Sequence, residues 1–457
     1  MIKETKLTDT TYKTLSAKLE LLGLHIPLLY LPEKGTDLDK WSVVACDQYT
    51  SDHAYWDRVE KNVGNAPSTL RITLPEIFLE APDVESRIKT IHESMKQYLD
   101  NGTIQEYGKA IMYIERKTDA SGLRQGLLFA MDLERYDYAR DSKTLIRATE
   151  GTIVERIPPR LRVRKEATFE LPHIMILIDD PQRKLIETLV ATLPSKKPVY
   201  DISLMEHGGT LKGYAIDDSE SITLIANTLA SLYDTSCKTQ NTNQPLFFAM
   251  GDGNHSLATA KAHWEATKKA LRDAGATDDV IMAHPARFAL AEIVNIHSPG
   301  LRFEPIHRAI FSDSIKDVAD YVKNHALVKS AVQIDEPSLK SLLQSPDGQS
   351  RAGIWDGDSY FVLEFTDPSA KLPPAYIDEI FAAYNAEYPS KGKIDFIHGW
   401  DDTKKLSKEN ALGCFVPVIA RERLFQWVGK NGPLPRKAFS MGDAEEKKYY
   451  MECRKIR

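Results

Sequence analysis

The chain has 457 residues, of which 42% are hydrophobic and 27% are charged, and its net charge is −6. This composition is that of an ordinary folded protein and excludes wholesale disorder, and the charge balance gives no general attraction to nucleic acid or anionic lipid. Because single hydrophobic cores stop growing at roughly 250–300 residues, we expect an N-terminal lobe over residues 1–150, a central lobe over 151–312 and a C-terminal lobe over 313–457.

The N-terminal lobe contains segments with the periodicity of strands and of one helix. Residues 41–45 are predicted as a strand that runs into a polar cluster. Apolar residues three or four apart predict an amphipathic helix over 84–99. Two further strands are expected at 110–115 and 126–133.

Strands alternate with helices in the central lobe. This alternation favours βαβ-type pairing and a sheet that is at least partly parallel. The predicted strands are 174–178, 211–216, 246–250 and 288–295, and the predicted helices are 182–193, 219–233 and 254–274.

The C-terminal lobe shows the same mixture of elements. A helix is predicted over 314–326, strands over 352–355 and 360–365, and a charged helical tail within 429–457. The whole chain is therefore expected to be an α/β protein with mixed β-sheets and flanking helices.

The cysteines and the apolar segments indicate in which cellular compartment the protein is expected. The four cysteines lie far apart without a C-x-x-C spacing, so we expect neither a disulfide framework nor a structural zinc site. Residues 1–18 lack the apolar core of a secretion signal, and no apolar stretch approaches the about 20 residues that span a bilayer. We expect a cytoplasmic protein that binds neither nucleic acid nor membrane.

The sharpest local feature is a strand that stops at two glycines, Gly251 and Gly253, directly before a helix-compatible run from Asn254. Glycine permits positive φ and a close approach of a ligand to the backbone. A helix that begins here points amide N–H groups and its positive dipole end above the strand, which favours an anion such as phosphate. Asp252 could hold a divalent cation, and His255 could contact a phosphate or transfer a proton.

The same turn also has a purely structural interpretation. Asn254 can be an ordinary N-cap and His255 a polar surface residue. The segment lacks the Gly-Lys-Ser/Thr of a P-loop, and Ser256 stands where the dinucleotide fingerprint has its third glycine. The pattern alone leaves both interpretations open.

A second feature is a run of arginines that follows the prolines at 158–159. The prolines predict an extended turn rather than a helix interior. An extended segment would place Arg160, Arg162 and Arg164 on one face, where guanidinium groups suit bidentate binding of phosphate. The alternative is a solvated, salt-bridged surface segment.

Two more segments supply candidate residues. His307 and Arg308 follow a predicted strand and are candidates for contact with a nucleotide, although none of the histidines has the spacing of a zinc site. Asp47 lies at the end of the first predicted strand, where α/β proteins place ligands, and is a candidate base or metal ligand. The alternative is a capping turn into a helix that begins near His53.

Four long stretches in the same order resemble a known family over nearly the whole chain: 41–56 (WSVVACDQYTSDHAYW), 248–260 (FAMGDGNHSLATA), 291–311 (AEIVNIHSPGLRFEPIHRAIF) and 434–456 (LPRKAFSMGDAEEKKYYMECRKI). The resemblance is to the family known as domain of unknown function 1015. It implies a relation to free-serine kinases of the ParB/sulfiredoxin-like superfamily, which transfer a phosphoryl group from ATP or ADP to free L-serine with magnesium. A ParB/sulfiredoxin-like core with an additional lobe is therefore expected.

The resemblance also assigns roles to the glycine turn. In the superfamily a turn of this type at a helix N-terminus binds phosphate, and the common family form is Asp-Gly-His-His-Arg. This sequence keeps Asp252, Gly253 and His255, but has Asn254 and Ser256 in the other two places. The substitution at Ser256 removes an arginine that would bind phosphate.

A second family motif is kept in part. The usual His-Glu-Arg-Thr appears here with Glu155 and Arg156 kept and its histidine and threonine replaced. The serine kinases also use a catalytic glutamate near the N-terminus. Asp47 lies in the corresponding region without matching a motif.

The leading hypothesis is a nucleotide-dependent phosphotransferase that acts on a small hydroxyl compound, with Mg²⁺ and ATP or ADP as cofactors. The alternatives are a regulatory protein that binds a nucleotide or metabolite without turnover, and a structural or partner-binding protein; a homo-oligomer is compatible with each. The assigned residues are Asp47, Glu155 and His255 for catalysis, Gly251, Asp252, Gly253, Asn254, His255, Arg156, Arg160, His307 and Arg308 for phosphate or nucleotide, and Asp252 for the metal.

Overall fold

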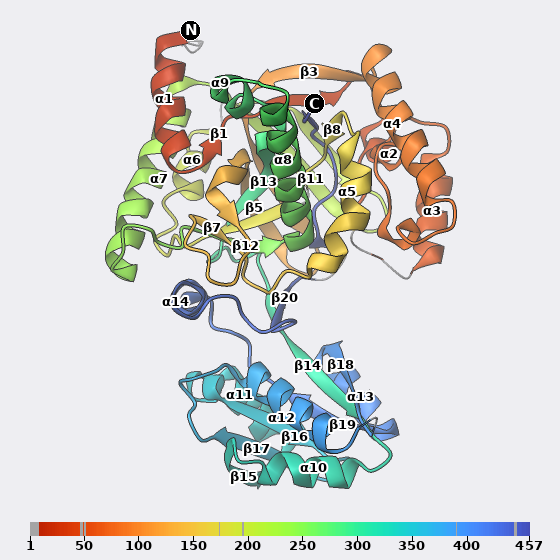
Figure 1. Ribbon diagram of the computed structural model, residues 1–457, viewed down its shortest axis with the longest axis vertical. Coiled ribbons are helices and arrows are strands. Elements are labelled where there is room, and N and C mark those ends of the chain that lie inside the picture. Colours follow the sequence, from red (N-terminus) through yellow and green to blue (C-terminus); the bar gives the residue numbers. More distant parts are fainter. Residues whose placement is uncertain are drawn as a thin grey trace. The chain divides into compact units, whose positions relative to one another are not determined.

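The computed structural model describes residues 9–45, 49, 52–172, 174–193, 196–389, 391–442 and 446–457, with their side chains except those of 9–13 and 409. The chain divides into two compact units. Unit 1 consists of Met1–Leu301, Val428–Gly432 and Asp443–Arg457, and unit 2 of Arg302–Trp427 and Pro433–Gly442. The elements are labelled in Figure 1.

Unit 1 holds nine of the labelled helices and two thirds of the strands. Its helices are α1 (Asp9–Leu21), α2 (Leu38–Trp41), α3 (His53–Val63), α4 (Val84–Asp100), α5 (Ile157–Lys165), α6 (Ile186–Val190), α7 (Ser219–Gln240), α8 (Asn254–Asp273) and α9 (Asp278–Met282). Its strands are β1 (Leu24–His25), β2 (Leu28–Pro32), β3 (Ile104–Lys109), β4 (Ile111–Thr118), β5 (Gly122–Asp132), β6 (Tyr136–Asp137), β7 (Ile146–Arg147), β8 (Phe169–Glu170), β9 (Ile174–Ile178), β10 (Tyr200–Leu204), β11 (Gly209–Ile216), β12 (Phe248–Asp252), β13 (Phe288–Asn295) and β21 (Arg454–Lys455).

One mixed sheet forms the centre of unit 1, in the order β10-β11-β4-β5-β13-β9-β12-β7-β6, with β1 beside β5. Strand β9 runs parallel to β13 and antiparallel to β12. Strands β4 and β5 come from the expected N-terminal lobe, yet they pair with β11 and β13 of the expected central lobe. Residues 1–150 and the central lobe therefore share one sheet, and unit 2 begins before residue 313.

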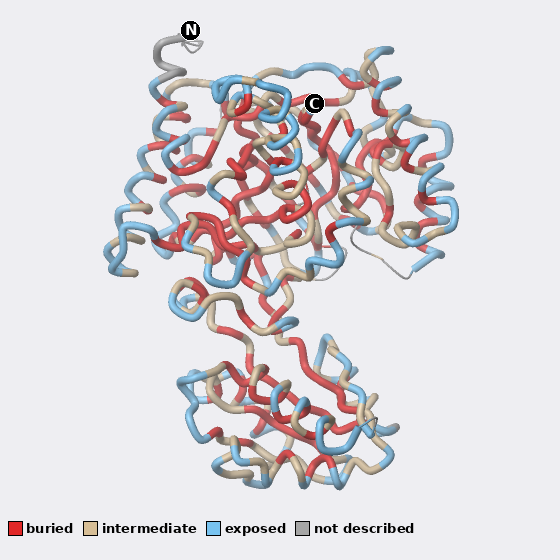
Figure 2. The backbone as a smooth tube through the Cα atoms, in the orientation of Figure 1, coloured by how far each residue is buried: buried red, intermediate tan, exposed pale blue. Residues whose placement is uncertain are grey.

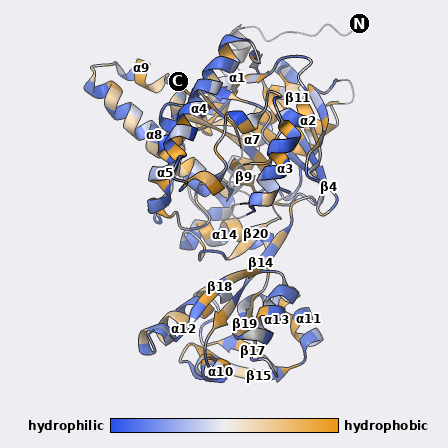
Figure 3. Cartoon of the chain, turned by 90° about the vertical axis from the view of Figure 1, so that its right-hand side faces the viewer, coloured by the Kyte–Doolittle hydropathy of each residue, from blue (hydrophilic) through white to orange (hydrophobic). Residues whose placement is uncertain are grey.

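The sheet separates two hydrophobic cores, because successive side chains of a strand point to opposite faces. On β5, Leu127 and Phe129 enter a core covered by α1, α6, α7, α8 and α9. Leu128 enters the opposite core, which is covered by α3, α4 and the C-terminal segment 446–457. Figure 2 shows the buried strands between the more exposed helices, and Figure 3 shows hydrophilic and hydrophobic residues side by side on those helices.

Unit 2 has its own sheet, in the order β15-β17-β16-β19-β14-β18, with β20 beside β14. Helices α10 and α12 pack on one core and α11 on a smaller second core. The helices are α10 (Ile315–Asn324), α11 (Glu336–Gln344), α12 (Pro373–Glu387) and α13 (Trp400–Glu409), while α14 (Arg421–Asn431) has residues in both units. The strands are β14 (Phe303–Phe311), β15 (Val328–Ile334), β16 (Arg351–Trp355), β17 (Tyr360–Phe365), β18 (Lys393–His398), β19 (Ala411–Phe415) and β20 (Phe439–Met441).

The expected class, an α/β protein with mixed sheets and flanking helices, is confirmed. Strands β9 and β13 have the predicted bounds, and α4 and α8 differ from prediction by one residue at their C-terminal ends. The ParB/sulfiredoxin-like core that the resemblance implies stays a prediction. No helix in the described part of the chain is both long and apolar enough to cross a membrane.

The strand predicted over 41–45 is absent. Helix α2 ends at Trp41, and Val44 makes a single bridge with Tyr449. The indole of Trp41 donates from Nε1 to the carbonyl of Met451 at 3.1 Å. The apolar residues of this segment are therefore buried against the C-terminal segment rather than paired in a sheet.

The arginine run is helical, which corrects the predicted extended turn. Residues 157–165 form α5 with the two prolines in its first turn, where a missing N–H is tolerated. Arg160 and Arg164 lie four residues apart and so share a helix face. Arg162 belongs to another face, and it pairs with the exposed Glu85 at 2.6 Å.

Two predicted helices are also corrected. The helix expected over 182–193 is limited to α6. After α14 ends at Asn431, no described residue of the expected helical tail lies in an α-helix. Glu446 lies in a 3-10 turn, and the residues after it form single bridges at Tyr449 and Cys453 and the strand β21, which pairs antiparallel with β8. Here pairing with distant segments decides the backbone conformation.

Candidate functional site

The glycine turn connects β12 directly to α8. Gly253 is the N-cap residue and adopts the left-handed conformation, with φ 80° and ψ 28°. A Cβ atom at this position would lie 3.1 Å from the Cα of Ile174, so the turn requires glycine both for its conformation and for space. Asn254 is the first helical residue, which contradicts the interpretation of Asn254 as N-cap. Gly253 offers the helix amides no side-chain cap.

A carboxylate and an ammonium group meet beside this turn. Asp252, the last residue of β12, lies with Oδ2 3.2 Å from Nζ of Lys447. The side chain of Lys447 is 11% exposed and that of Asp252 is 26% exposed, so the pair is partly shielded from water. Among the residues that the structure describes, no three His, Cys, Asp or Glu side chains gather as a metal site. Asp252 is thus a single carboxylate ligand at most.

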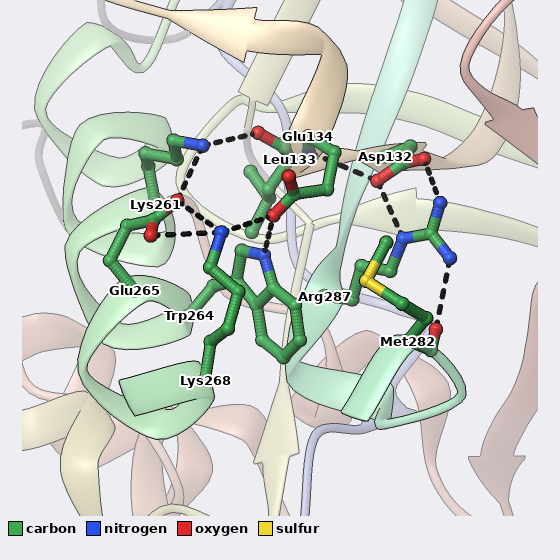
Figure 4. Close-up of polar contacts among 9 residues, drawn as sticks. All are labelled: Asp132, Leu133, Glu134, Lys261, Trp264, Glu265, Lys268, Met282 and Arg287. Carbon is green, nitrogen blue, oxygen red and sulfur yellow. Dashed lines mark hydrogen bonds and ion pairs between the residues drawn. The ribbon is translucent and has the colours of Figure 1, made fainter. Parts of the chain in front are cut away.

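Polar contacts along α8 fix the helix that carries the turn (Figure 4). Lys261 donates to the carbonyl of Leu133 at 2.9 Å. The Glu134 carboxylate accepts from Trp264 Nε1 at 2.5 Å and from Lys268 Nζ at 2.6 Å. These bonds attach the middle of α8 to the segment after β5.

Helix α5 packs beside α8, and a cavity of about 170 Å³ lies next to both. Ser256 and Thr259, from the first two turns of α8, line the cavity, and so does Arg160 from α5. The remaining wall is mainly apolar, with Leu74 and Phe169 among its residues. The structure therefore brings the glycine-turn helix and the predicted Arg160 to one cavity.

The charged groups of this cavity are paired. Arg160 forms an ion pair with Glu76. Arg164 and Arg454 both bind Glu170, at 2.5 and 2.6 Å. Burial opposes ionisation of Glu170, but the two guanidinium groups outweigh burial and lower the pKa of this carboxyl.

The remaining predicted residues of unit 1 are less closely engaged. Glu155 and Arg156 lie in the 3-10 turn Val154–Arg156 and their side chains are exposed. Arg156 uses its backbone carbonyl to accept a hydrogen bond from Arg160 Nη1 at 2.8 Å. Asp47 lies outside the described residues. His255 is half-buried in the first turn of α8, and its carbonyl accepts from Thr259 at 2.7 Å.

His307 and Arg308 lie in unit 2, on β14. Arg308 is fully buried and binds both carboxylate oxygens of Asp378, at 2.9 and 3.0 Å. His307 accepts at Nδ1 from the amide of Val416 at 3.2 Å, and its ring packs against Phe415. Burial lowers the pKa of His307 to about 3. Within unit 2 both side chains have structural partners.

Sequence reasoning named Arg164 with Arg160 and Arg162, but it did not find Lys447 or Glu170 as members of this region. Glu170 and Arg454 are far apart in the chain, and Lys447 reaches the glycine turn only because the C-terminal segment returns to unit 1. The one available signal was the excess of lysine and arginine in residues 447–457.

Several solved structures are similar to this chain. A free serine kinase in complex with AMP is 10% identical with a TM-score of 0.35, over 75% of this chain and 93% of that chain. A mutant free serine kinase in complex with ADP is 9% identical with a TM-score of 0.36, over 75% and 95%. SbnI from Staphylococcus aureus with a C-terminal truncation is 9% identical with a TM-score of 0.34, over 69% and 82%.

The search of curated proteins finds no match. Residues 30–382 match the model of the family described as "Protein of unknown function (DUF1015)", and the chain belongs to that family.

Proposed function

We propose that unit 1 is a nucleotide-dependent phosphotransferase that acts on a small hydroxyl compound. The observation that carries this proposal is the glycine turn at the N-terminus of α8, which has the Asp252–Lys447 pair beside it and is followed by Ser256, a residue that lines a cavity together with Arg160. The parts suit a ligand with phosphates at one end and an apolar group at the other.

The phosphates would lie over Gly251 to Asn254. The positive end of the α8 dipole, equivalent to roughly half an elementary charge, favours an anion there. Gly253 lets the backbone approach the ligand because it carries no side chain. His255, in the first helical turn, would contact the transferred phosphoryl group, and Arg156 and Arg160 would neutralise developing charge after small side-chain movements.

The cavity beside Ser256 would hold the less polar part of the nucleotide or the acceptor. Its apolar wall favours a planar or aliphatic group, while the hydroxyl of Ser256 would supply an orienting hydrogen bond. Arg160 forms an ion pair with Glu76 at this cavity. A ligand phosphate would replace the Glu76 carboxylate as the partner of the Arg160 guanidinium.

The chemistry needs little covalent machinery. The acceptor hydroxyl oxygen attacks the terminal phosphorus, the bond from that phosphorus to the bridging oxygen of the nucleotide breaks, and the hydroxyl proton passes to a base. Glu155 and Asp47 are the candidate bases. Asp252 fits a Mg²⁺ ion that is bound mainly by nucleotide phosphates and by one protein carboxylate, the usual arrangement for this ion; the ion would supply charge neutralisation on the phosphates.

Binding without turnover is the second candidate function. The carboxylates of the cavity wall, Glu76 and Glu170, are both held by arginines, so neither is arranged as a base. A nucleotide- or metabolite-binding regulatory protein, as a monomer or a homo-oligomer, needs no such base.

Thermal unfolding with ATP, ADP and Mg²⁺, separately and together, tests the binding part. A ligand that binds only the folded state raises stability by about 2.7 kcal/mol at a hundredfold excess over its dissociation constant. Phosphorus NMR with L-serine and other hydroxyl compounds as acceptors then tests transfer.

Variants separate the two candidates. Asp252→Ala and His255→Ala are expected to reduce both the stabilisation and the transfer. Asp273→Ala, which removes a carboxylate at the far end of α8, is the matched control and should leave both unchanged. Stabilisation without any transferred phosphoryl group would favour the regulatory protein, and unchanged behaviour of both turn variants would refute the assigned site.

A further inference from the structure

Unit 1 contains a second, larger cavity of about 520 Å³ beside β1 and β21. Residues of α1, β1, β2, β13 and β21 line it. Its volume lies within the roughly 300–1,000 Å³ that is usual for small-molecule sites. Among the described residues, none lines both this cavity and the cavity beside α8. The two cavities are therefore separate places in the fold.

Arg454 supplies one fixed part of the wall of this second cavity. Its guanidinium pairs with Glu170 at 2.6 Å and also donates to the carbonyls of Pro285 and Phe288. Glu170 lies in the wall of the other cavity. Because Glu170 neutralises the Arg454 charge and the two carbonyls take further donors, Arg454 holds the wall in place and is not available to bind an anion.

Lys455, the next residue of β21, brings a positive charge to the cavity. Its backbone is fixed by antiparallel pairing with Phe169 on β8. Its side chain is half-buried, and Nζ lies 4.9 Å from the centre of the Tyr30 ring. In the part of the chain that the structure describes, no carboxylate pairs with Lys455. A partly buried ammonium group without a counter-charge favours an anionic ligand.

Polar side chains from α1 and β1 line another part of the cavity. Nδ1 of His25 lies 3.8 Å from Oε1 of Glu20. Burial lowers the pKa of His25, so its imidazole is neutral and carries one N–H. With that N–H at Nδ1, towards the Glu20 carboxylate, Nε2 is a hydrogen-bond acceptor.

Two polar atoms of these side chains lack a hydrogen bond. Nε2 of His25 and Oγ of Ser16 are buried, and neither has a partner within the residues that the structure describes. Buried polar atoms are satisfied almost everywhere in folded proteins, so two unsatisfied atoms on residues that line a cavity indicate a ligand with a hydrogen-bonding group. A hydroxyl group suits either atom, because it can both donate and accept.

The rest of the wall is mainly apolar and contains aromatic rings. The ring of His25 packs on that of Phe288, with centroids 4.2 Å apart, and the ring of Tyr30 lies beside Lys455. Aromatic faces favour a planar ring in the ligand.

We infer that this cavity binds a small aromatic carboxylate that carries a hydroxyl group. The carboxylate pairs with Lys455, and the aromatic ring lies against Phe288. The hydroxyl group donates to Nε2 of His25 once the imidazole rotates towards the cavity. This site is independent of the proposed phosphotransferase and needs no nucleotide.

The test is calorimetric titration of the full chain with 4-hydroxybenzoate and, in parallel, with benzoate, which lacks the hydroxyl group, and phenol, which lacks the carboxylate. Lys455→Met removes the ammonium charge and keeps most of the aliphatic stem, whereas Lys455→Arg keeps a charge. His25→Phe keeps a ring against Phe288 and removes both ring nitrogens. Lys89→Met is the matched control, because the side chain of Lys89 on α4 is 78% exposed. Thermal unfolding of each variant establishes that it folds.

Lys455→Met is expected to weaken the binding of 4-hydroxybenzoate by about tenfold or more, the usual loss for a hydrogen bond to a charged group. His25→Phe should weaken it by about threefold to tenfold, because one neutral hydrogen bond is lost. Benzoate should bind His25→Phe as it binds the unmodified chain, since benzoate has no hydroxyl group. Lys455→Arg and Lys89→Met should stay within about threefold of the unmodified chain.

Three results would overturn the site. The first is no binding of 4-hydroxybenzoate by the unmodified chain at millimolar concentration, and the second is equal affinity of Lys455→Met and the unmodified chain. The third is an equal loss of affinity for phenol and 4-hydroxybenzoate in Lys455→Met, because phenol has no carboxylate for the ammonium group to bind. Each of these results would leave the proposed phosphotransferase untouched, since the two cavities are separate.

Discussion

Replacement of Glu170 by glutamine removes a buried negative charge on which two arginines depend. The residue is 8% exposed, and Arg454, its principal partner, is 5% exposed. The carboxylate accepts from Arg454 Nε at 2.7 Å, from Arg164 Nη2 at 2.5 Å and from the amide of Leu290 at 2.8 Å. Glu170→Gln therefore leaves the Arg454 guanidinium charge buried without a counter-charge.

The expected loss can be estimated from these contacts. Breaking a buried pair by removing one partner costs about 3–5 kcal/mol of unfolding free energy. Arg454 keeps two carbonyl acceptors, Pro285 O at 2.9 Å and Phe288 O at 2.5 Å, and glutamine keeps one oxygen for the amide of Leu290. We therefore expect Glu170→Gln to lower the unfolding free energy by about 3 kcal/mol, the lower end of that range.

The chain also provides the control. Glu166 pairs with Arg457 in the same region, but these side chains are 54% and 60% exposed, so Glu166→Gln should cost little, about 0–1 kcal/mol. Because a chain with two units has no single two-state free energy, hydrogen exchange of peptides from β8 and β13 during urea unfolding is the suitable assay.

The pH dependence gives a second readout. The pKa of Glu170 is lower in the folded state, so its contribution to stability is present above the unfolded pKa of about 4.3 and is lost as pH falls through the folded pKa. Glu170→Gln should remove this part of the acid sensitivity. Equal small losses for Glu166→Gln and Glu170→Gln would refute the reasoning.

Three further predictions follow from the glycine turn and from unit 2. Gly253→Ala should lower the unfolding free energy of unit 1 by about 1–2 kcal/mol because of the positive φ, and further because the new Cβ would contact Ile174. It should also weaken ADP binding in titrations, whereas the control Gly151→Ala, with open space around it, should bind ADP normally. His307 has a folded pKa of about 3 against about 6.5 unfolded, so unit 2 should lose stability as pH falls from about 6.5 towards 3, and His307→Gln should remove that dependence in urea titrations monitored at several pH values. Arg308→Lys should lower the unfolding free energy of unit 2 by about 2–3 kcal/mol, because an ammonium group cannot replace the bidentate contact; an unchanged denaturation midpoint would contradict it.

The parts of the fold that the sequence predicts well are those decided by local patterns. Strand β9 consists of five buried apolar residues, and β13 has a similar run, so their bounds were correct. The glycine turn before α8 was recognised because glycine, asparagine and the change of periodicity all lie within a few residues. Here local propensity and the tertiary structure agree.

The parts that failed depend on contacts between distant segments. Residues 41–45 have the composition of a strand, but the segment they lie against is the C-terminal one, which no local pattern reveals. The prolines at 158–159 predict a turn because proline disrupts a helix interior, whereas their place in the first turn of α5 makes them compatible with a helix. Lys447 reaches Asp252 only through the return of the chain to unit 1.

That return has a consequence for biosynthesis. Residues 446–457 supply Tyr449, Tyr450, Met451, Cys453 and Ile456 to the core that α3 and α4 cover. They leave the ribosome after all of unit 2, so unit 2 can fold on a nascent chain while β8 still lacks its partner β21 and one face of the unit 1 sheet lacks five core side chains. During translation this face exposes apolar surface of the kind that chaperones bind. Residues late in the chain thus complete a core that α3 and α4, much earlier in the chain, begin.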